Sequence, residues 1–172
     1  SIEASDLIVR GTMPRTFDGT GGAGVWAQLG ARLVVSGARI EGSHMVGIAS
    51  VNGASVEARE VVVSGVDPSR CASGFCTGDT GGFGLVAIFG GTLLATDFTD
   101  EGATLCGVLV GREGASGPSA LDLQRGVIDR AAIGACVQVD GYDTTRLQNG
   151  VEYRDVGVPL RATSYELPDM LP

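Results

Sequence analysis

Lysine is absent from this sequence of 172 residues. All twelve basic residues are arginine, and twenty acidic residues bring the net charge to −8. An acidic chain repels phosphate backbones and anionic headgroups, so we expect neither nucleic acid nor an anionic membrane as a partner. Long apolar runs are also missing, so the sequence predicts no membrane span in this segment. No signal peptide stands at Ser1, and the chain begins on repeat sequence, so we expect a piece of a longer protein.

Aromatic residues are scarce at 5% of the chain, although 44% of it is hydrophobic. Its core must therefore consist of Val, Leu, Ile and Ala. Amphipathic helices of about ten or more residues are missing too, which argues against a βαβ fold because its parallel strands need such crossovers. The 28 glycines carry no collagen-like period and predict many bends. The length suits one domain with a substantial core.

What the sequence does contain is a repeat: two short apolar pairs joined by a two-residue bend. The copies are "IEASDLIVRG" (2–11), "LVVSGARIEG" (33–42), "VEAREVVVSG" (56–65), "LLATDFTDEG" (93–102), "LDLQRGVIDR" (121–130) and "TRLQNGVEYR" (145–154). Their first apolar column reads Ile2, Leu33, Val56, Leu93, Leu121 and Thr145, and their fourth reads Val9, Ile40, Val63, Asp100, Ile128 and Glu152. A further short strand, usually introduced by glycine, follows most copies, as in "GIASVNG" and "GLVAIFG".

One such coil cannot bury its own apolar side, but stacked coils can, because each strand pairs in parallel with its equivalent one coil away. The pattern therefore predicts an all-β parallel β-helix of about six coils over residues 1–156. A Pro-bearing tail, 157–172, is expected to cap the exposed strand edges of the same domain. The alternative, a β-sandwich, should show hairpin turns such as Asn-Gly between copies, whereas "QNG" lies inside one.

Uneven coil lengths with long inserts resemble the right-handed, pectin-lyase-like β-helices rather than the regular left-handed kind. The insert "VRGTMPRTFDGTGGAGV" (9–25) matches "VSGVDPSRCASGFCTGDTGGFGL" (63–85), which places long loops on alternate coils. This arrangement resembles the repeats of large surface proteins of myxobacterial type. The resemblance implies a right-handed, single-stranded solenoid and an exported bacterial protein, and it implies no activity.

The four cysteines fall into two pairs. Cys71 and Cys76 lie in a Gly-rich loop, where a local disulfide and hence an exported protein is favoured over free thiols or half a zinc site. Cys106 and Cys136 fall in strands of consecutive coils but one position out of register, so their side chains are expected to face opposite ways. Buried free thiols are therefore favoured slightly over a disulfide for this second pair.

The strongest candidate for chemistry is a column of bend residues, Glu60, Asp97 and Arg125, on consecutive coils. Two carboxylates near an arginine are the groups of a polysaccharide lyase or glycoside hydrolase, and the alternative is a solvated bend with partly cancelling charges. Asp100 and Glu101 suggest at most a weak calcium site, and no other cofactor and no further metal site is expected. Asp100 stands in an apolar column, so either the coil deforms there or backbone donors cap its carboxyl.

Trp26 and Phe83, beside the two long loops, could form an exposed patch for a sugar or a protein, or pack beneath those loops. The loops themselves, 10–24 and 64–84, are expected on one side of the molecule. We expect a non-catalytic extracellular or cell-surface module with a scaffold, adhesion or ligand-binding role. Its expected partner is a polysaccharide or another surface protein. A carbohydrate-active enzyme that works on the outer β-helix face is the alternative.

Overall fold

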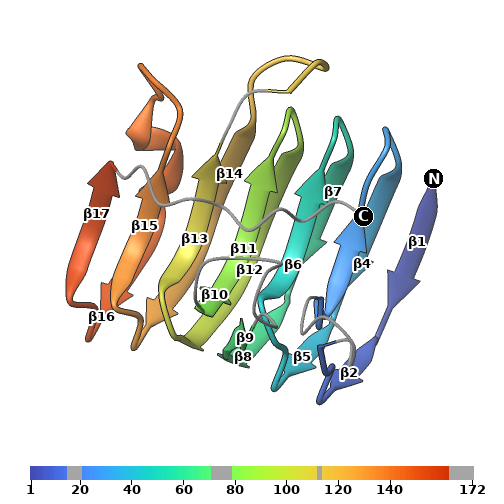
Figure 1. Cartoon of the computed structure of the whole chain (residues 1–172), viewed down its shortest axis with the longest axis horizontal. Helices are drawn as coiled ribbons and strands as arrows, with labels where there is room; N and C mark the ends of the chain where they lie inside the picture. The colour runs from blue at the N-terminus through green and yellow to red at the C-terminus, as the bar shows by residue number, and fades with distance from the viewer. Residues whose placement is uncertain (15–20, 71–78, 112–113, 163–172) are drawn as a thin grey trace.

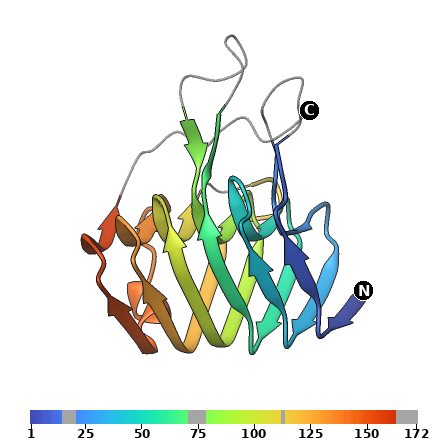
Figure 2. The ribbon, with the colours of Figure 1, turned by 90° about the horizontal axis from the view of Figure 1, so that it is seen from below.

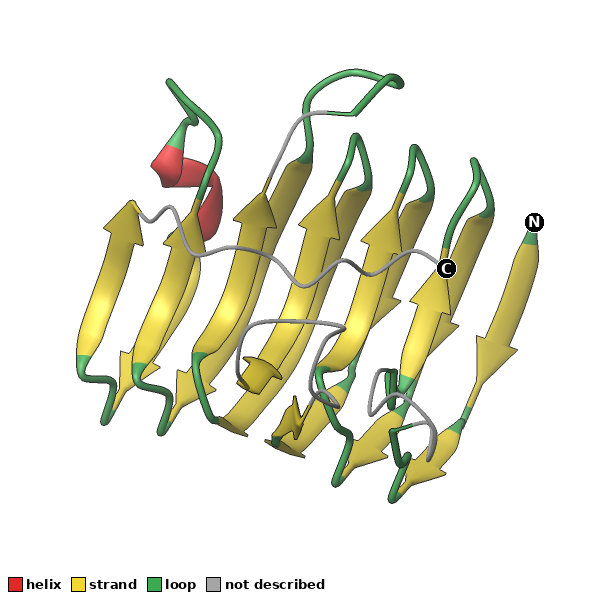
Figure 3. Cartoon of the chain, in the orientation of Figure 1, coloured by secondary structure: helices red, strands yellow, loops and turns green. Residues whose placement is uncertain are grey.

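The computed structural model describes residues 1–14, 21–70, 79–111 and 114–162. The described residues are almost entirely β-structure, with one short 3-10 helix, η1 (Thr144–Leu147) (Figure 3). The only antiparallel pair of named strands in these ranges is the hairpin of β9 (Pro68–Arg70) and β10 (Asp79–Gly81), within the second long loop. The protein is therefore all-β, with mostly parallel strands in curled sheets.

The parallel strands form three rows, and each repeat contributes to the rows in turn (Figure 1). The first row holds β1 (Ile2–Ser5), β4 (Arg32–Ser36), β7 (Ser55–Arg59) and the first halves of β12 (Thr92–Ala103) and β14 (Ala120–Asp129). The second row holds β2 (Ile8–Arg10), β5 (Arg39–Glu41), β8 (Val62–Val66), the second halves of β12 and β14, and β16 (Asn149–Arg154). The third row holds β3 (Val25–Ala27), β6 (Val46–Val51), β11 (Phe83–Ile88), β13 (Cys106–Gly111), β15 (Ile133–Val137) and β17 (Val158–Ala162).

The first two rows join into one nine-stranded sheet, because β12 and β14 pass through the bend unbroken, and the third row is a separate six-stranded sheet. Successive repeats follow one another along the molecule (Figure 2). This arrangement is compatible with a parallel β-helix-like solenoid.

The strand register confirms the predicted alignment for the first five copies. In the first row the paired residues run Ile2, Leu33, Val56, Leu93, Leu121 and, two positions on, Ala4, Val35, Ala58, Ala95, Leu123. From the second repeat on, most of these side chains are buried in one core cluster that runs through the molecule. Identical columns therefore lie over one another, as the repeat requires.

The predicted alignment of the sixth copy is wrong by one residue. Val151, not Gly150, lies opposite Gly126, and Tyr153, not Glu152, lies opposite Ile128. The first half of this copy forms η1 instead of a strand, and the extra backbone of the helix displaces the second half of the copy by one position. Since side chains alternate along a strand, the shift turns Tyr153 toward the core and leaves Glu152 outside.

The bend between the first two rows has a left-handed backbone in every repeat. Its residues are Asp6, Gly37, Glu60, Asp97, Arg125 and Gly150, with φ between 51° and 66°. All are exposed. A non-glycine residue in this conformation costs roughly 1–2 kcal/mol, so Glu60, Asp97 and Arg125 occupy positions that glycine would fill with less strain.

The core narrows where the second row meets the start of the third. Glycine stands there in the first five repeats, at Gly24, Gly47, Gly84, Gly107 and Gly134, and Pro159 takes the equivalent place in β17. A Cβ added at any of them would overlap a side chain of the second row, such as Val63 opposite Gly47 or Ile128 opposite Gly107. These glycines are therefore needed to make room for a side chain of the second row, which is β-branched opposite Gly24, Gly47 and Gly107.

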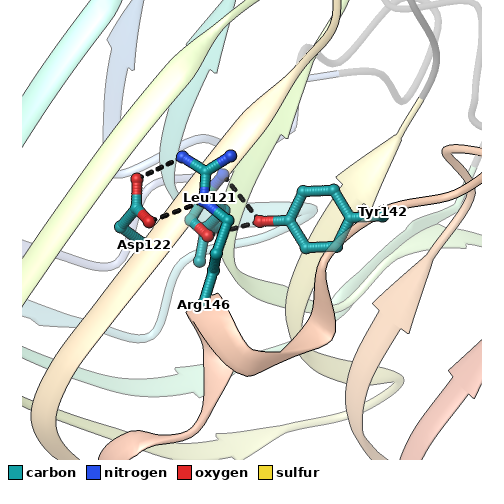
Figure 4. A network of polar contacts seen from close by, with 4 residues as sticks. All are labelled: Leu121, Asp122, Tyr142 and Arg146. Carbon is teal, nitrogen blue, oxygen red and sulfur yellow. Dashed lines mark hydrogen bonds and ion pairs between the residues drawn. The ribbon is translucent and has the colours of Figure 1, made fainter.

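The edge of β14 is closed by the segment that contains η1 (Figure 4). The Tyr142 hydroxyl donates to the carbonyl of Leu121 at 2.5 Å and accepts from its N–H at 3.1 Å. Arg146 donates two hydrogen bonds to Asp122, from Nε to Oδ1 at 2.7 Å and from Nη2 to Oδ2 at 2.5 Å. Its guanidinium carbon lies 5.7 Å from the ring centre of Tyr142. Side chains thus satisfy the strand edge where the sixth repeat supplies no strand.

The sequence predicts segment 157–172 to be a cap, but this segment begins with a strand of the third row. Its residues 158–162 are β17, which pairs in parallel with β15. Residues 163–172 lie outside the described residues. The cap seen on the first row is therefore the η1 segment, which precedes the predicted tail.

Replacing Tyr142 with phenylalanine should lower the free energy of unfolding by about 1–3 kcal/mol, because a half-buried backbone N–H and C=O lose their partner. Urea denaturation of the purified variant measures this loss. The matched control is Tyr153→Phe, whose hydroxyl makes one bond, to the Leu147 carbonyl at 2.8 Å, and which should therefore cost less. A Tyr142→Phe protein as stable as the native one would show that Tyr142 does not hold the edge.

Candidate functional site

The bend column brings together two of the three residues expected there to carry chemistry. Arg125 pairs with Asp97 through two parallel bonds, Nε to Oδ1 and Nη2 to Oδ2, both 2.8 Å. The pair is exposed, with side-chain accessibilities of 63% for Arg125 and 48% for Asp97. Glu60 lies beside Asp97 in the same column, where its backbone N–H donates to the Thr96 carbonyl. The predicted stacking of the three bend residues is thus present, with the arginine bound to the middle one.

The pairing fixes the charge of both groups. The hydrogen bond from Arg125 lowers the pKa of Asp97 below its ordinary value, and Asp97 in turn raises the pKa of Arg125. Asp97 is therefore ionised at neutral pH and unable to act as a general acid. Arg125 is held protonated and unable to act as a base. Chemically, the pair is therefore a planar ion pair on the protein surface rather than an acid or a base.

Replacing Arg125 with glutamine should return the pKa of Asp97 toward its usual value, seen as an upward shift of its carboxyl titration in ¹³C NMR. Because the folded pKa is lowered, the small stabilisation from this pair is present at neutral pH and fades as pH falls through the folded pKa. Arg39→Gln is the control, since Arg39 lies beside Glu41 and not Asp97. An Asp97 titration unchanged by Arg125→Gln would contradict the pairing.

Asp100 points into the protein. It exposes 1% of its surface, and neither carboxylate oxygen has a hydrogen-bond partner in the described structure. Its carboxyl lies against the backbone of Gly84, in the narrow part of the core. Burial raises the pKa of Asp100 well above its ordinary value, because the charged form loses its hydration, and so favours the protonated carboxyl.

Neither expectation for Asp100 describes what the structure shows. The strand does not deform, since Asp100 stays in register between Val63 and Ile128. Backbone donors do not cap it either, because both oxygens are unpaired in the described ranges. The structure instead holds an unpaired carboxyl inside the core, where burial raises its pKa and favours the protonated form.

The three acidic residues of "TDFTDEG" do not converge. Asp97 lies on the outer bend, Asp100 inside, and Glu101 outside, where it pairs with Arg130 on the next repeat. Within the described ranges no group of three or more His, Cys, Asp or Glu side chains is placed to hold a metal ion.

Many of the charged side chains on the outer surface of the first two rows form ion pairs with neighbouring side chains. Besides Asp97–Arg125 and Glu101–Arg130, ion pairs join Arg10 to Glu41, Arg59 to Glu57, Arg146 to Asp122 and Arg154 to Glu152. Several of these link one repeat to the next. Paired charges are thus a recurring feature of the outer surface of these rows.

Cys106 and Cys136 form a disulfide, so the preference for free thiols at these positions is wrong. Their Cα atoms lie 6.1 Å apart. The expectation failed because it assumed strict alternation of side chains along the strand. Gly107 and Val108 both face the core, so alternation skips a residue there. Cys136, at the place of Leu109, therefore faces outward like Cys106. Cys71 and Cys76, the other predicted disulfide, lie outside the described residues.

The two aromatic candidates lie on the outer side of the third row, in an apolar cluster. Phe83 exposes only 3% of its surface and packs there, so it is not part of an exposed patch. Trp26 is half-buried at the edge of the cluster, and its indole N–H donates to Gln28 Oε1 at 2.9 Å. Both aromatics therefore have packing roles in this structure.

Sequence reasoning missed two features: the Tyr142–Arg146 closure and the second apolar cluster. The first carried a weak signal in "GYDTTRL", where Asp143 caps η1 by accepting from the Thr145 N–H at 3.0 Å. The second was visible in "GLVAIFG" and "GVLVGREG", which are apolar on consecutive residues rather than alternating. A strand of that kind is buried on both faces.

Comparison with protein-family models, with curated proteins and with solved structures gives no match to this chain. The described residues contain no helix long and apolar enough to cross a membrane. The arguments for function therefore start from the geometry of the chain itself.

Proposed function

We propose that this chain is a non-catalytic module of a larger exported bacterial protein, with a scaffold, adhesion or ligand-binding role. In this proposal it is a right-handed parallel β-helix of about six coils, of the pectin-lyase-like kind, with long loops on alternate coils. Support comes from the register of the first five repeats and from the β9–β10 hairpin that begins one long loop. A stack of this kind is a stiff rod that holds surface loops at fixed spacing.

The observation that carries the non-catalytic role is the state of the candidate acidic residues. Hydrolysis of a glycosidic bond needs one protonated and one ionised carboxyl facing the substrate. Here Asp97 is held ionised by Arg125, Asp100 is inside the core, and Glu101 is paired with Arg130. These are the features of a surface that supports the fold and presents charge. A polysaccharide or another surface protein is the partner that we propose for it.

The export of the protein is part of the proposal. The Cys106–Cys136 disulfide supports it, because such bonds form and persist in oxidising compartments and are rare in the cytosol.

The deciding experiment combines a glycan array with a cleavage assay on soluble polyuronates, with and without calcium. We expect binding without turnover: retained glycans on the array and no unsaturated or reducing-end product. Asp97→Asn serves as the comparison, since it removes the carboxylate and leaves the backbone bend. Product release by the native chain that Asp97→Asn abolishes would overturn the proposal in favour of a lyase or hydrolase.

A further inference from the structure

The end of the molecule formed by β1 and β2, the β1–β2 end, exposes apolar side chains (Figure 1). Ile2 exposes 65% of its surface, whereas Leu93 and Leu121, in the same inner column, expose 1% and 0%. Five large apolar side chains are exposed among the described residues, and four of them lie in the first repeat: Ile2, Ile8, Met13 and Leu29. The apolar surface of this part of the chain is thus concentrated at one end.

The backbone of β1 also directs hydrogen-bonding groups out of this end. The Asp6 N–H donates to the Ser36 carbonyl of the next repeat at 2.9 Å, so the Ser36 carbonyl points back toward the first repeat. Ser5 holds the place of Ser36 in the first repeat, and β1 is the last described strand of its row. The Ser5 carbonyl therefore points outward. Because backbone groups alternate in direction along a strand, those of Glu3 point the same way.

The same holds for β2, the last described strand of the second row on this side. The Arg39 N–H donates to the Leu7 carbonyl of the first repeat at 2.8 Å. Ile8 holds the place of Arg39, so its N–H points outward, and the backbone groups of Arg10 follow by alternation. Both rows thus present a strand edge that can form a ladder with another strand.

The opposite end of the first row is closed. There the Tyr142 hydroxyl bonds both backbone groups of Leu121, in the segment that contains η1 (Figure 3). A head-to-tail stack of copies would therefore meet a closed edge in its first row. A contact between two β1–β2 ends instead uses one surface twice and closes on itself.

We propose that two copies of this chain dimerise through their β1–β2 ends, about a two-fold axis near the bend between β1 and β2. Such an axis places β1 of one copy antiparallel to β2 of the other, and the contact occurs twice. Ala4 and Val9 continue the inner columns of Val35 and Ile40. In the proposed register Ala4 lies opposite the partner's Val9, so the inner columns of the two copies meet.

This register also brings the outward backbone groups and opposite charges together. Glu3 lies opposite the partner's Arg10, and Ser5 lies opposite the partner's Ile8, as the hydrogen-bonded pairs of an antiparallel ladder. The side chains of Glu3 and Arg10 both stand on the outer side, and opposite charges at facing positions stabilise a strand pair. Arg10 donates from Nε to Glu41 at 2.7 Å, and a guanidinium with five donors can bind a second carboxylate beside it.

Analytical ultracentrifugation over a range of protein concentrations tests the dimer. We expect the native chain to show a reversible monomer–dimer equilibrium. Glu3→Arg and Arg10→Glu should each weaken dimerisation about tenfold, because both opposite-charge contacts become like-charge contacts. An equal mixture of the two variants should dimerise like the native chain, since each contact again joins opposite charges. Val158→Asp, at an exposed apolar position of the opposite end, is the control and should change nothing.

Three outcomes would overturn the proposal: a native chain that stays monomeric up to millimolar concentration, assembly beyond the dimer, or weakening by Val158→Asp. Hydrogen exchange of the native chain gives a readout without substitutions. The Ile8 amide should exchange more slowly as protein concentration rises, whereas the Arg39 amide, bonded within the chain, should not change. An Ile8 exchange rate independent of concentration would equally exclude this interface, even if dimers formed.

Discussion

Replacing Asp100 with valine should raise the free energy of unfolding at pH 7 by about 1–4 kcal/mol, because a buried carboxyl without partners gives way to an apolar side chain. Valine fits the site, since the equivalent residue one repeat earlier is Val63, packed against the equivalent glycine. The pH dependence should change as well. The pKa of Asp100 is raised in the folded state, so stability falls as pH rises from the unfolded value toward the folded one. Asp100→Val should remove that decline.

Urea denaturation at several pH values between about 4 and 8 measures both effects, since this range starts near the ordinary Asp pKa. Asp100→Asn is the matched control: it cannot ionise, so it should lose the decline with pH, yet it keeps unpaired polar atoms and should gain less. A valine variant less stable than the native protein at pH 7 would mean that the Asp100 carboxyl has a stabilising partner.

Replacing both Cys106 and Cys136 with alanine should lower the free energy of unfolding by about 3–4 kcal/mol, the chain-entropy estimate for a loop of this length. The disulfide closes a loop with a sequence separation of 30 and joins β13 to β15, so its loss frees one whole repeat in the unfolded chain. Denaturation under non-reducing conditions measures the change.

Cys71→Ala with Cys76→Ala provides the comparison for this experiment, and its shorter loop predicts a smaller loss if those residues are bonded. Thiol labelling of the native protein before unfolding should leave Cys106 and Cys136 unmodified. Labelling of either residue, or a double variant of native stability, would contradict the disulfide.

The parallel register could be derived from the sequence because the apolar columns are long and recur. Columns through Val35, Ala58 and Ala95 repeat in five copies, and any other pairing would expose them. The predicted alignment of the sixth copy failed because η1 replaces a strand there. A helical turn has a smaller rise per residue than an extended strand, so it changes the register of the residues that follow. Capping by Asp143 favours the helical turn over a strand, and an alignment of apolar columns does not take such local capping into account.

The candidate site was foreseeable only in its placement. Stacking of Glu60, Asp97 and Arg125 follows from the bend column, but the bidentate pair depends on side-chain geometry that spacing does not specify. The cysteine pairing was missed because one strand position departs from alternation at Gly107. Asp100 could be placed inside from its column, but its raised pKa follows from burial in the core, which the identities of its sequence neighbours do not specify.

The three rows pair each repeat only with the one before and the one after. Such a molecule melts as a linear array, and its ends open before its middle. The amides of β1 and β2, which have a neighbour on one side only among the described strands, should exchange with deuterium first, and those of β7 and β12, which have strands on both sides, last. Asp100 lies in the slowest part of that gradient, and the disulfide joins the next two strands of the third row that follow it. Substitutions there therefore change global unfolding, whereas substitutions in β1 are felt mainly as fraying.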